Sequence, residues 1–96
     1  MPASKQNIIN LVILPIEVEV MDCVASILEV TKLKYPGNMF QAAVQVKCNE
    51  NTSQVFHIRY FDARELETKL ALEVSKFKYM LYLYGKDEMK RRGLVL

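Results

Sequence analysis

The sequence predicts an α+β fold, in which an antiparallel sheet of three to four strands is followed by one long C-terminal helix packed on one face. Apolar and polar residues alternate at 16–20, 39–48 and 54–61, which is typical of half-buried strands. Apolar residues recur at intervals of three and four over 62–84, which is typical of an amphipathic helix. With 96 residues, the chain is expected to form a single domain.

The first part of the chain is predicted to enter the sheet after a short leader. Residues 1–7 are mostly polar and are expected to form a flexible N-terminus, and residues 8–61 are expected to build the sheet. Glu17 and Glu19 alternate with apolar neighbours in the first clear strand. Pro15 cannot donate a hydrogen bond to a neighbouring strand, so it indicates an edge, a bulge or a break.

The segment 22–34 is compatible with either a strand or a helix. Asp22 could cap a helix, yet β-branched residues are frequent in this segment. The turn at 35–38, Tyr-Pro-Gly-Asn, has proline and glycine where a hairpin turn needs them. We therefore favour a strand, and the alternative is the order β-α-β-β-α.

Two further strands follow with clear alternation. In 39–48, one face carries Phe40, Ala42, Val44, Val46 and Cys48, and the other carries Gln41, Ala43, Gln45 and Lys47. In 54–61, Phe56, Ile58 and Tyr60 share one side, opposite Val55, His57, Arg59 and Phe61. The sets without charge are predicted to face the core.

The long helix is predicted over 62–85, followed by a basic tail at 86–96. Asp62 can cap its start, Glu65 can reach back to the Asp62 amide, and Gly85 can end it in a left-handed conformation. Its length, about 35 Å at ~1.5 Å per residue, exceeds that of a typical strand. Residues 79–84 are apolar or aromatic on every side. This pattern predicts a homodimer interface at Phe77, Met80, Leu81 and Tyr84.

Composition gives few indications of chemistry. The formal net charge is +2. Cys23 and Cys48 are expected to be reduced thiols of an intracellular, cytoplasmic protein, with one bridge as the alternative in an oxidising compartment. The apolar stretch at 8–14 is too short to span a bilayer, so no membrane partner is expected.

The chain lacks the usual signatures of catalysis and of cofactor binding. His57 is its one histidine, and it falls on a strand face. The cysteines lack metal-site spacing, and three scattered glycines cannot form a phosphate-binding loop. We therefore expect no enzyme activity, no metal and no cofactor.

The strongest candidate surface is the outer face of the sheet. Cations there could follow phosphates, and flat side chains could stack on unpaired bases. The basic tail could add phosphate contacts. The candidate residues for binding nucleic acid are Lys32, Lys34, Tyr35, Lys47, His57, Arg59, Phe61, Lys90, Arg91 and Arg92.

The order of elements over 8–84 resembles that of small single-strand-binding domains, namely the Whirly proteins, the ThermoDBP proteins of thermophilic archaea and small DNA-binding proteins of archaeal viruses. The resemblance implies a non-catalytic homodimer that binds single-stranded DNA or RNA with little sequence specificity. The alternative function is a protein–protein interaction module or a small subunit of a larger complex.

Overall fold

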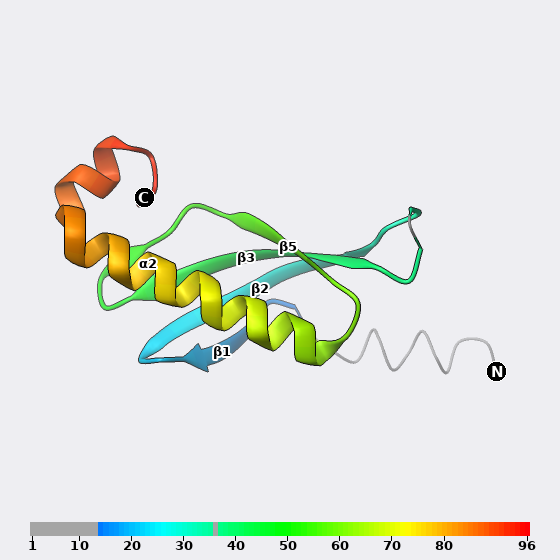
Figure 1. Cartoon of the computed structure of the whole chain (residues 1–96). Coiled ribbons are helices and arrows are strands. Elements are labelled where there is room, and N and C mark those ends of the chain that lie inside the picture. The colour runs from blue at the N-terminus through cyan, green and yellow to red at the C-terminus, as the bar shows by residue number, and fades with distance from the viewer. Residues whose placement is uncertain (1–13, 36) are drawn as a thin grey trace.

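The computed structural model describes residues 14–35 and 37–96, and within them an antiparallel sheet precedes one long helix (Figure 1). The predicted α+β class is therefore confirmed. The predictions for residues 1–13 and for Pro36 fall outside the described residues. The elements in chain order are β1 (Ile16–Val20), β2 (Cys23–Lys32), β3 (Phe40–Cys48), β4 (Asn51–Thr52), β5 (Phe56–Tyr60) and α2 (Ala63–Arg91).

Strand β3 lies at the centre of the sheet. One of its sides pairs with β2, which pairs in turn with β1, and its other side pairs with both β4 and β5. All of these pairings are antiparallel. The sheet edges in the described chain are therefore formed by β1 on one side and by β4 and β5 on the other.

The segment 22–34 forms strand β2 up to Lys32, so the helical alternative is wrong. Met21 and Asp22 have φ angles of 47° and 68° and connect β1 directly to β2. Two consecutive residues with positive φ are typical of the two-residue turn that suits the twist of a hairpin. Asp22 therefore lies in a hairpin turn instead of capping a helix.

Strand β2 contains a β-bulge. Ile27 pairs with Val44, and the preceding residue of β3, Ala43, pairs with Glu29, because the two strands are antiparallel. Leu28 is the extra residue. An extra residue reverses the faces on which later side chains lie, so the alternation read from the sequence no longer holds after this point.

The core lies between α2 and one face of the sheet. The helix buries Leu70, Val74 and Phe77 against it. From the strands, the buried apolar residues are alternate positions, as predicted for half-buried strands, namely Cys23, Ala25, Ile27, Ala42, Val44, Val46, Cys48, Ile58 and Tyr60. Figure 1 shows α2 crossing this face along its length.

The two cysteines form a disulfide, which corrects the expectation of reduced thiols. Cys23 precedes Val24 and Cys48 follows Lys47, and because Val24 and Lys47 are paired in an antiparallel ladder, the two cysteines face each other across β2 and β3. Their Cα atoms are 4.5 Å apart, the usual spacing of a pair in an antiparallel sheet that exchanges no main-chain hydrogen bonds. The bridge ties the ends of these two strands together.

The helix begins as predicted, with one difference. The Asp62 carboxylate accepts a hydrogen bond of 2.8 Å from the Glu65 amide. The Glu65 carboxylate in turn accepts from the amide of Phe61 at 2.6 Å, and not from that of Asp62. The reciprocal cap is thus shifted by one residue, and it still holds two main-chain amides at the start of the helix.

The predicted helix end at Gly85 is confirmed only in part. Gly85 does adopt positive φ, at 79°, but a second helical segment follows this kink. That segment ends where Gly93 has φ 76° and donates to the Lys90 carbonyl, while Leu94 donates to the Met89 carbonyl. This pair of bonds is the Schellman motif, in which glycine accommodates the left-handed residue after a helix.

The tail after the helix returns to the sheet instead of extending as a basic arm. Val95 pairs with Ser53, and the Leu96 amide donates to the Thr52 carbonyl at 2.8 Å. Met89 and Val95 are buried. Burial of these two apolar side chains stabilises the return of the tail to the sheet. The prediction of a basic tail considered only the charged residues and did not include this burial.

We predict that Met89→Ala destabilises the whole domain, because the Met89 side chain has no exposed surface. The expected loss is ~2–5 kcal/mol in the free energy of unfolding, measured by urea denaturation. Lys90→Ala, at an exposed neighbouring position, serves as the control. Equal stability of the two variants would contradict the proposed packing of the tail.

We predict that reduction of the Cys23–Cys48 bridge lowers the free energy of unfolding by ~3 kcal/mol, because the bridge closes a loop of 25 residues. Urea denaturation with and without dithiothreitol measures the effect. A variant with both cysteines replaced by alanine should be insensitive to the reductant. Two titratable thiols in the untreated folded protein would contradict the disulfide.

Candidate interaction surfaces

The outer face of the sheet, opposite α2, carries three of the predicted nucleic-acid-binding residues. Lys47, His57 and Arg59 are exposed. By register, His57 lies beside Ala43, and Arg59 lies beside Gln41. The Arg59 Nε donates to the Gln41 Oε1 at 3.2 Å. These side chains therefore share the predicted face.

Carboxylates share this outer face, which the sequence analysis did not take into account. Glu17 and Glu19 of β1 and Glu29 of β2 are exposed, and their cross-strand partners are Ser26, Val24 and Ala43. Three carboxylates against the two cations Lys47 and Arg59 give a formal charge of −1, with His57 neutral. The alternation at 16–20 was the signal for two of them. This face repels phosphates more than it attracts them.

Lys32 leaves the outer face because of the bulge in β2. It pairs with Phe40, whose ring stacks on the buried Tyr60 with centroids 5.6 Å apart. Burial raises the pKa of the Tyr60 hydroxyl. Lys32 is thus on the same side of the sheet as α2, which corrects its predicted place.

Two other predicted residues lie beyond β2, at the hairpin end of the sheet. Lys34 is exposed, and Tyr35 is 87% exposed. We call Lys32, Lys34 and Tyr35 the hairpin cluster. Phe61 lies in the connection between β5 and α2 and is 50% exposed.

The arginines of the predicted basic tail are engaged within their own helical segment. Glu88 forms ion pairs with both Arg91 and Arg92, the latter at 2.7 Å. The Arg92 guanidinium also lies 4.2 Å from the centre of the Tyr84 ring. Hydrogen bonds from Arg92 and then Arg91 lower the pKa of the Glu88 carboxyl. Lys90 is exposed on the same segment.

The predicted dimer interface is mostly part of the core or packed on it. Phe77 is buried, and Met80 and Leu81 are partly buried against the core. Tyr84 is exposed but lies under the Arg92 guanidinium. These four side chains do not form a common exposed surface.

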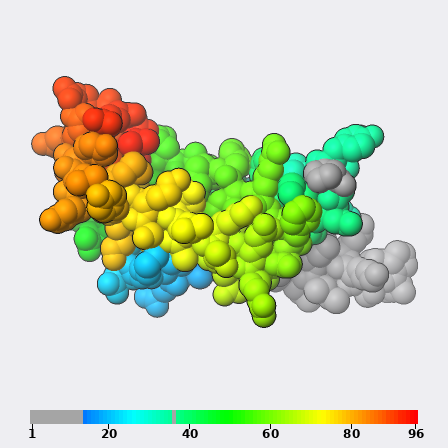
Figure 2. Space-filling model, viewed as in Figure 1, coloured from blue at the N-terminus to red at the C-terminus, as the bar shows by residue number. Residues whose placement is uncertain are grey.

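A different set of apolar side chains lies on the outward side of α2. We call Leu72, Tyr79, Tyr82 and Leu83 the helix ridge; their exposed fractions run from 51% to 84%. Leu72, Tyr79 and Leu83 are spaced by seven and four residues, so they share one side of the helix. Figure 2 shows this outward side, in yellow and orange, uncovered by the rest of the described chain. The apolar end at 79–84 was evident in the sequence, whereas the exposure of Leu72 was not predicted.

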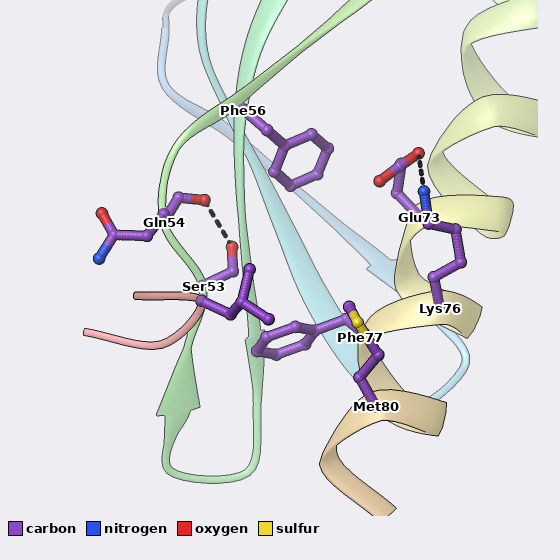
Figure 3. A pocket seen from close by; sticks show the side chains of 8 residues that line it. Ser53, Gln54, Phe56, Glu73, Lys76, Phe77 and Met80 are labelled. Carbon is purple, nitrogen blue, oxygen red and sulfur yellow. Dashed lines mark hydrogen bonds and ion pairs between the residues drawn. The ribbon is translucent and has the colours of Figure 1, made fainter. Parts of the chain in front are cut away.

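A groove runs between β5 and α2 and contains two adjoining hollows that share Glu73. The first, of about 250 Å³, has apolar walls formed by Phe56, Phe77, Met80 and Leu94. Figure 3 shows Phe56 on the strand side, Phe77 and Met80 on the helix side, and the Glu73–Lys76 ion pair on the helix above Phe77 and Met80. The second hollow, of about 340 Å³, is lined by His57, Ile58, Arg59, Lys69, Leu72 and Glu73. We call this feature the β5–α2 groove.

The described part of the chain contains neither a metal-binding cluster of side chains nor a membrane-spanning helix. In residues 14–35 and 37–96, no group of three or more histidine, cysteine, aspartate or glutamate residues is arranged to hold a metal ion. No helix in the same residues is long and apolar enough to cross a membrane.

Comparison of the chain with protein-family models, with curated proteins and with solved structures finds no match. The resemblance to the single-strand-binding domains therefore stays a prediction that rests on the order of elements. A function must therefore be inferred from the exposed surfaces of the molecule.

Proposed function

We propose that this chain is a non-catalytic protein-interaction module that forms a homodimer through its helix ridge. The observation that carries the proposal is the exposure of Leu72, Tyr79, Tyr82 and Leu83 on one helix. A surface helix normally turns polar side chains outward. Contiguous exposed apolar side chains mark interfaces, and tyrosine is enriched in the centre of such interfaces.

The helix ridge is suited to pairing with a second copy of itself. In an antiparallel pair related by a twofold axis, Leu72 of one copy would lie against Leu83 of the other. Lys76 would then lie against the Tyr79 ring of the second copy, an arrangement that favours a cation–π contact. Each residue would thus meet a chemically suitable residue, as a twofold interface requires.

The Glu73–Lys76 ion pair does not stand in the way of this arrangement. Its atoms are 3.2 Å apart, and the Lys76 side chain is 64% exposed. Exposed pairs of this kind contribute ~0–1 kcal/mol, so Lys76 can change partner at little cost.

Pairing through the helices would turn both sheets away from the dimer. Because α2 covers only one face of its sheet (Figure 1), the order of layers would be sheet, helix, helix, sheet. The two outer faces and both β5–α2 grooves would be arranged symmetrically. Such a dimer is suited to join two partners or to act as a small subunit of a larger complex.

We predict that the double variant Tyr79→Glu/Leu83→Glu is monomeric. Two buried like charges should weaken self-association at least about 100-fold, since interface residues of this kind often contribute ~2 kcal/mol or more each. Light scattering coupled to gel filtration measures the mass. Glu67→Lys, at an exposed helix position outside the ridge, should leave the dimer intact. A monomeric unmodified chain at high concentration would contradict the proposal.

Single-stranded nucleic acid is a second candidate ligand, favoured by the hairpin cluster. Lys32 and Lys34 could hold phosphates, and the Tyr35 ring, 87% exposed, is free to stack on a base. Arg59 lies on the opposite face of the sheet from Lys32, since their β3 partners Gln41 and Phe40 are adjacent and point to opposite sides, so it does not belong to this cluster. The binding would be electrostatic, with little sequence specificity.

We predict that Lys32→Glu/Lys34→Glu weakens binding of a labelled oligothymidine roughly tenfold or more at low salt, because each lost phosphate contact reduces the electrostatic affinity. Fluorescence anisotropy measures the affinity. Lys47→Glu, on the acidic outer face, should have a smaller effect. Absence of binding by the unmodified protein at low salt would rule out this candidate.

A further inference from the structure

We propose that the β5–α2 groove binds an extended acidic peptide of a partner protein, which adds a strand to β5 and places an apolar side chain in the first hollow. The inference rests on the proposal that the chain is a protein-interaction module and names the partner's chemistry. It does not require the dimer.

The main-chain groups of β3 show which groups of β5 are already used. Val46 accepts from the Ser53 amide at 2.8 Å, and its own amide donates to the Ser53 hydroxyl at 2.9 Å. Main-chain groups of alternate residues point to the same side of a strand. Val44 and Ala42 therefore also direct their amides and carbonyls toward β5.

Within residues 14–35 and 37–96, the opposite edge of β5 is consequently open. The partners of Val44 and Ala42 are Phe56 and Ile58, so His57 and Arg59 direct their main-chain groups away from the sheet. The Arg59 carbonyl accepts from the Lys69 Nζ at 2.7 Å on this edge, which agrees with that direction. The His57 amide and carbonyl and the Arg59 amide remain as a template for an incoming strand.

The first hollow can take one apolar side chain of that strand. Phe56, Phe77, Met80 and Leu94 line it, and its volume is about 250 Å³. The hollow opens directly beside β5, since Phe56 of this strand forms part of its wall (Figure 3). Strand addition obtains affinity from main-chain hydrogen bonds and specificity from pockets for alternate side chains.

The charge of the groove favours acidic residues beside this apolar residue. Lys69 and Lys76 line the two hollows against Glu73, and the Arg59 side chain lies on the outer-face side of the same edge strand, so an added strand would have three cations beside it against one carboxylate. Glu65 pairs with Lys69 at 3.4 Å, and the balance stays positive when it is counted. Complementary charge speeds association and rejects basic peptides.

Fluorescence anisotropy with a labelled peptide, Asp-Glu-Val-Thr-Phe-Thr-Val-Glu-Asp, tests the inference. We expect saturable binding that is lost when the phenylalanine of the peptide is replaced by serine. His57→Pro should weaken binding about tenfold or more, because proline removes the edge amide without removing a bond to β3. Binding that is unchanged in a folded His57→Pro variant would overturn the inference.

Lys69→Gln provides a second test if His57→Pro does not fold. It should weaken binding roughly two- to fivefold, as expected for one exposed charge, while Lys86→Gln, an exposed helix lysine outside the groove, should not. Equal affinities of these two variants would count against the charge argument. Chemical-shift changes at the His57 and Arg59 amides on adding the peptide are expected, and their absence would overturn strand addition.

The Tyr79→Glu/Leu83→Glu variant separates this inference from the proposed dimer. Peptide binding by that monomer supports the groove whether or not the unmodified chain dimerises. A dimer that dissociates in the ridge variant but never binds the peptide would retain the proposed function and overturn the groove. If His57→Pro dissociates the dimer, the groove is occupied by a second copy of the chain. That result would also overturn the peptide inference.

Discussion

The structure depends on one-sided burial, in which a single helix covers a single face of the sheet. Leu70, Val74 and Phe77 remove that face from water, and burial of apolar area is the main favourable contribution to folding. Because the described chain has no second layer, the outer sheet face, the helix ridge and the open edge of β5 are all exposed. Each candidate surface is a consequence of this one arrangement.

The C-terminal segment extends the core beyond what a sheet and one straight helix would give. Gly85 redirects the chain, Met89 is buried, and Val95 pairs beside β4 at Ser53. The same segment supplies Leu94 to the apolar hollow of the β5–α2 groove. The groove is therefore built from residues far apart in sequence, and two of the basic residues near the end of the chain, Arg91 and Arg92, form ion pairs with Glu88.

The fold could be predicted because period-two and period-3.6 patterns report which side of each element is buried. The pattern placed His57 and Arg59 outward correctly, but it failed for Lys32 because the extra residue Leu28 reverses the faces of β2. The helical segment after the Gly85 kink was missed because two glycines, Gly85 and Gly93, both have positive φ, and only the second completes a Schellman motif. The apolar Met89 and Leu94 around Gly93 were the available signal. The groove could not be predicted, since it depends on how strand and helix approach each other.

The disulfide also determines what would happen if the hairpin were cut. The bridge joins Cys23 to Cys48, and the exposed Tyr35 lies between them in the sequence, at a tip of the kind that proteases attack most readily. Cleavage there would leave two fragments that stay covalently linked as one molecule under oxidising conditions. Gel electrophoresis would show a single band until a reducing agent separated the pieces, and β3, β5 and α2 would all remain on the same fragment.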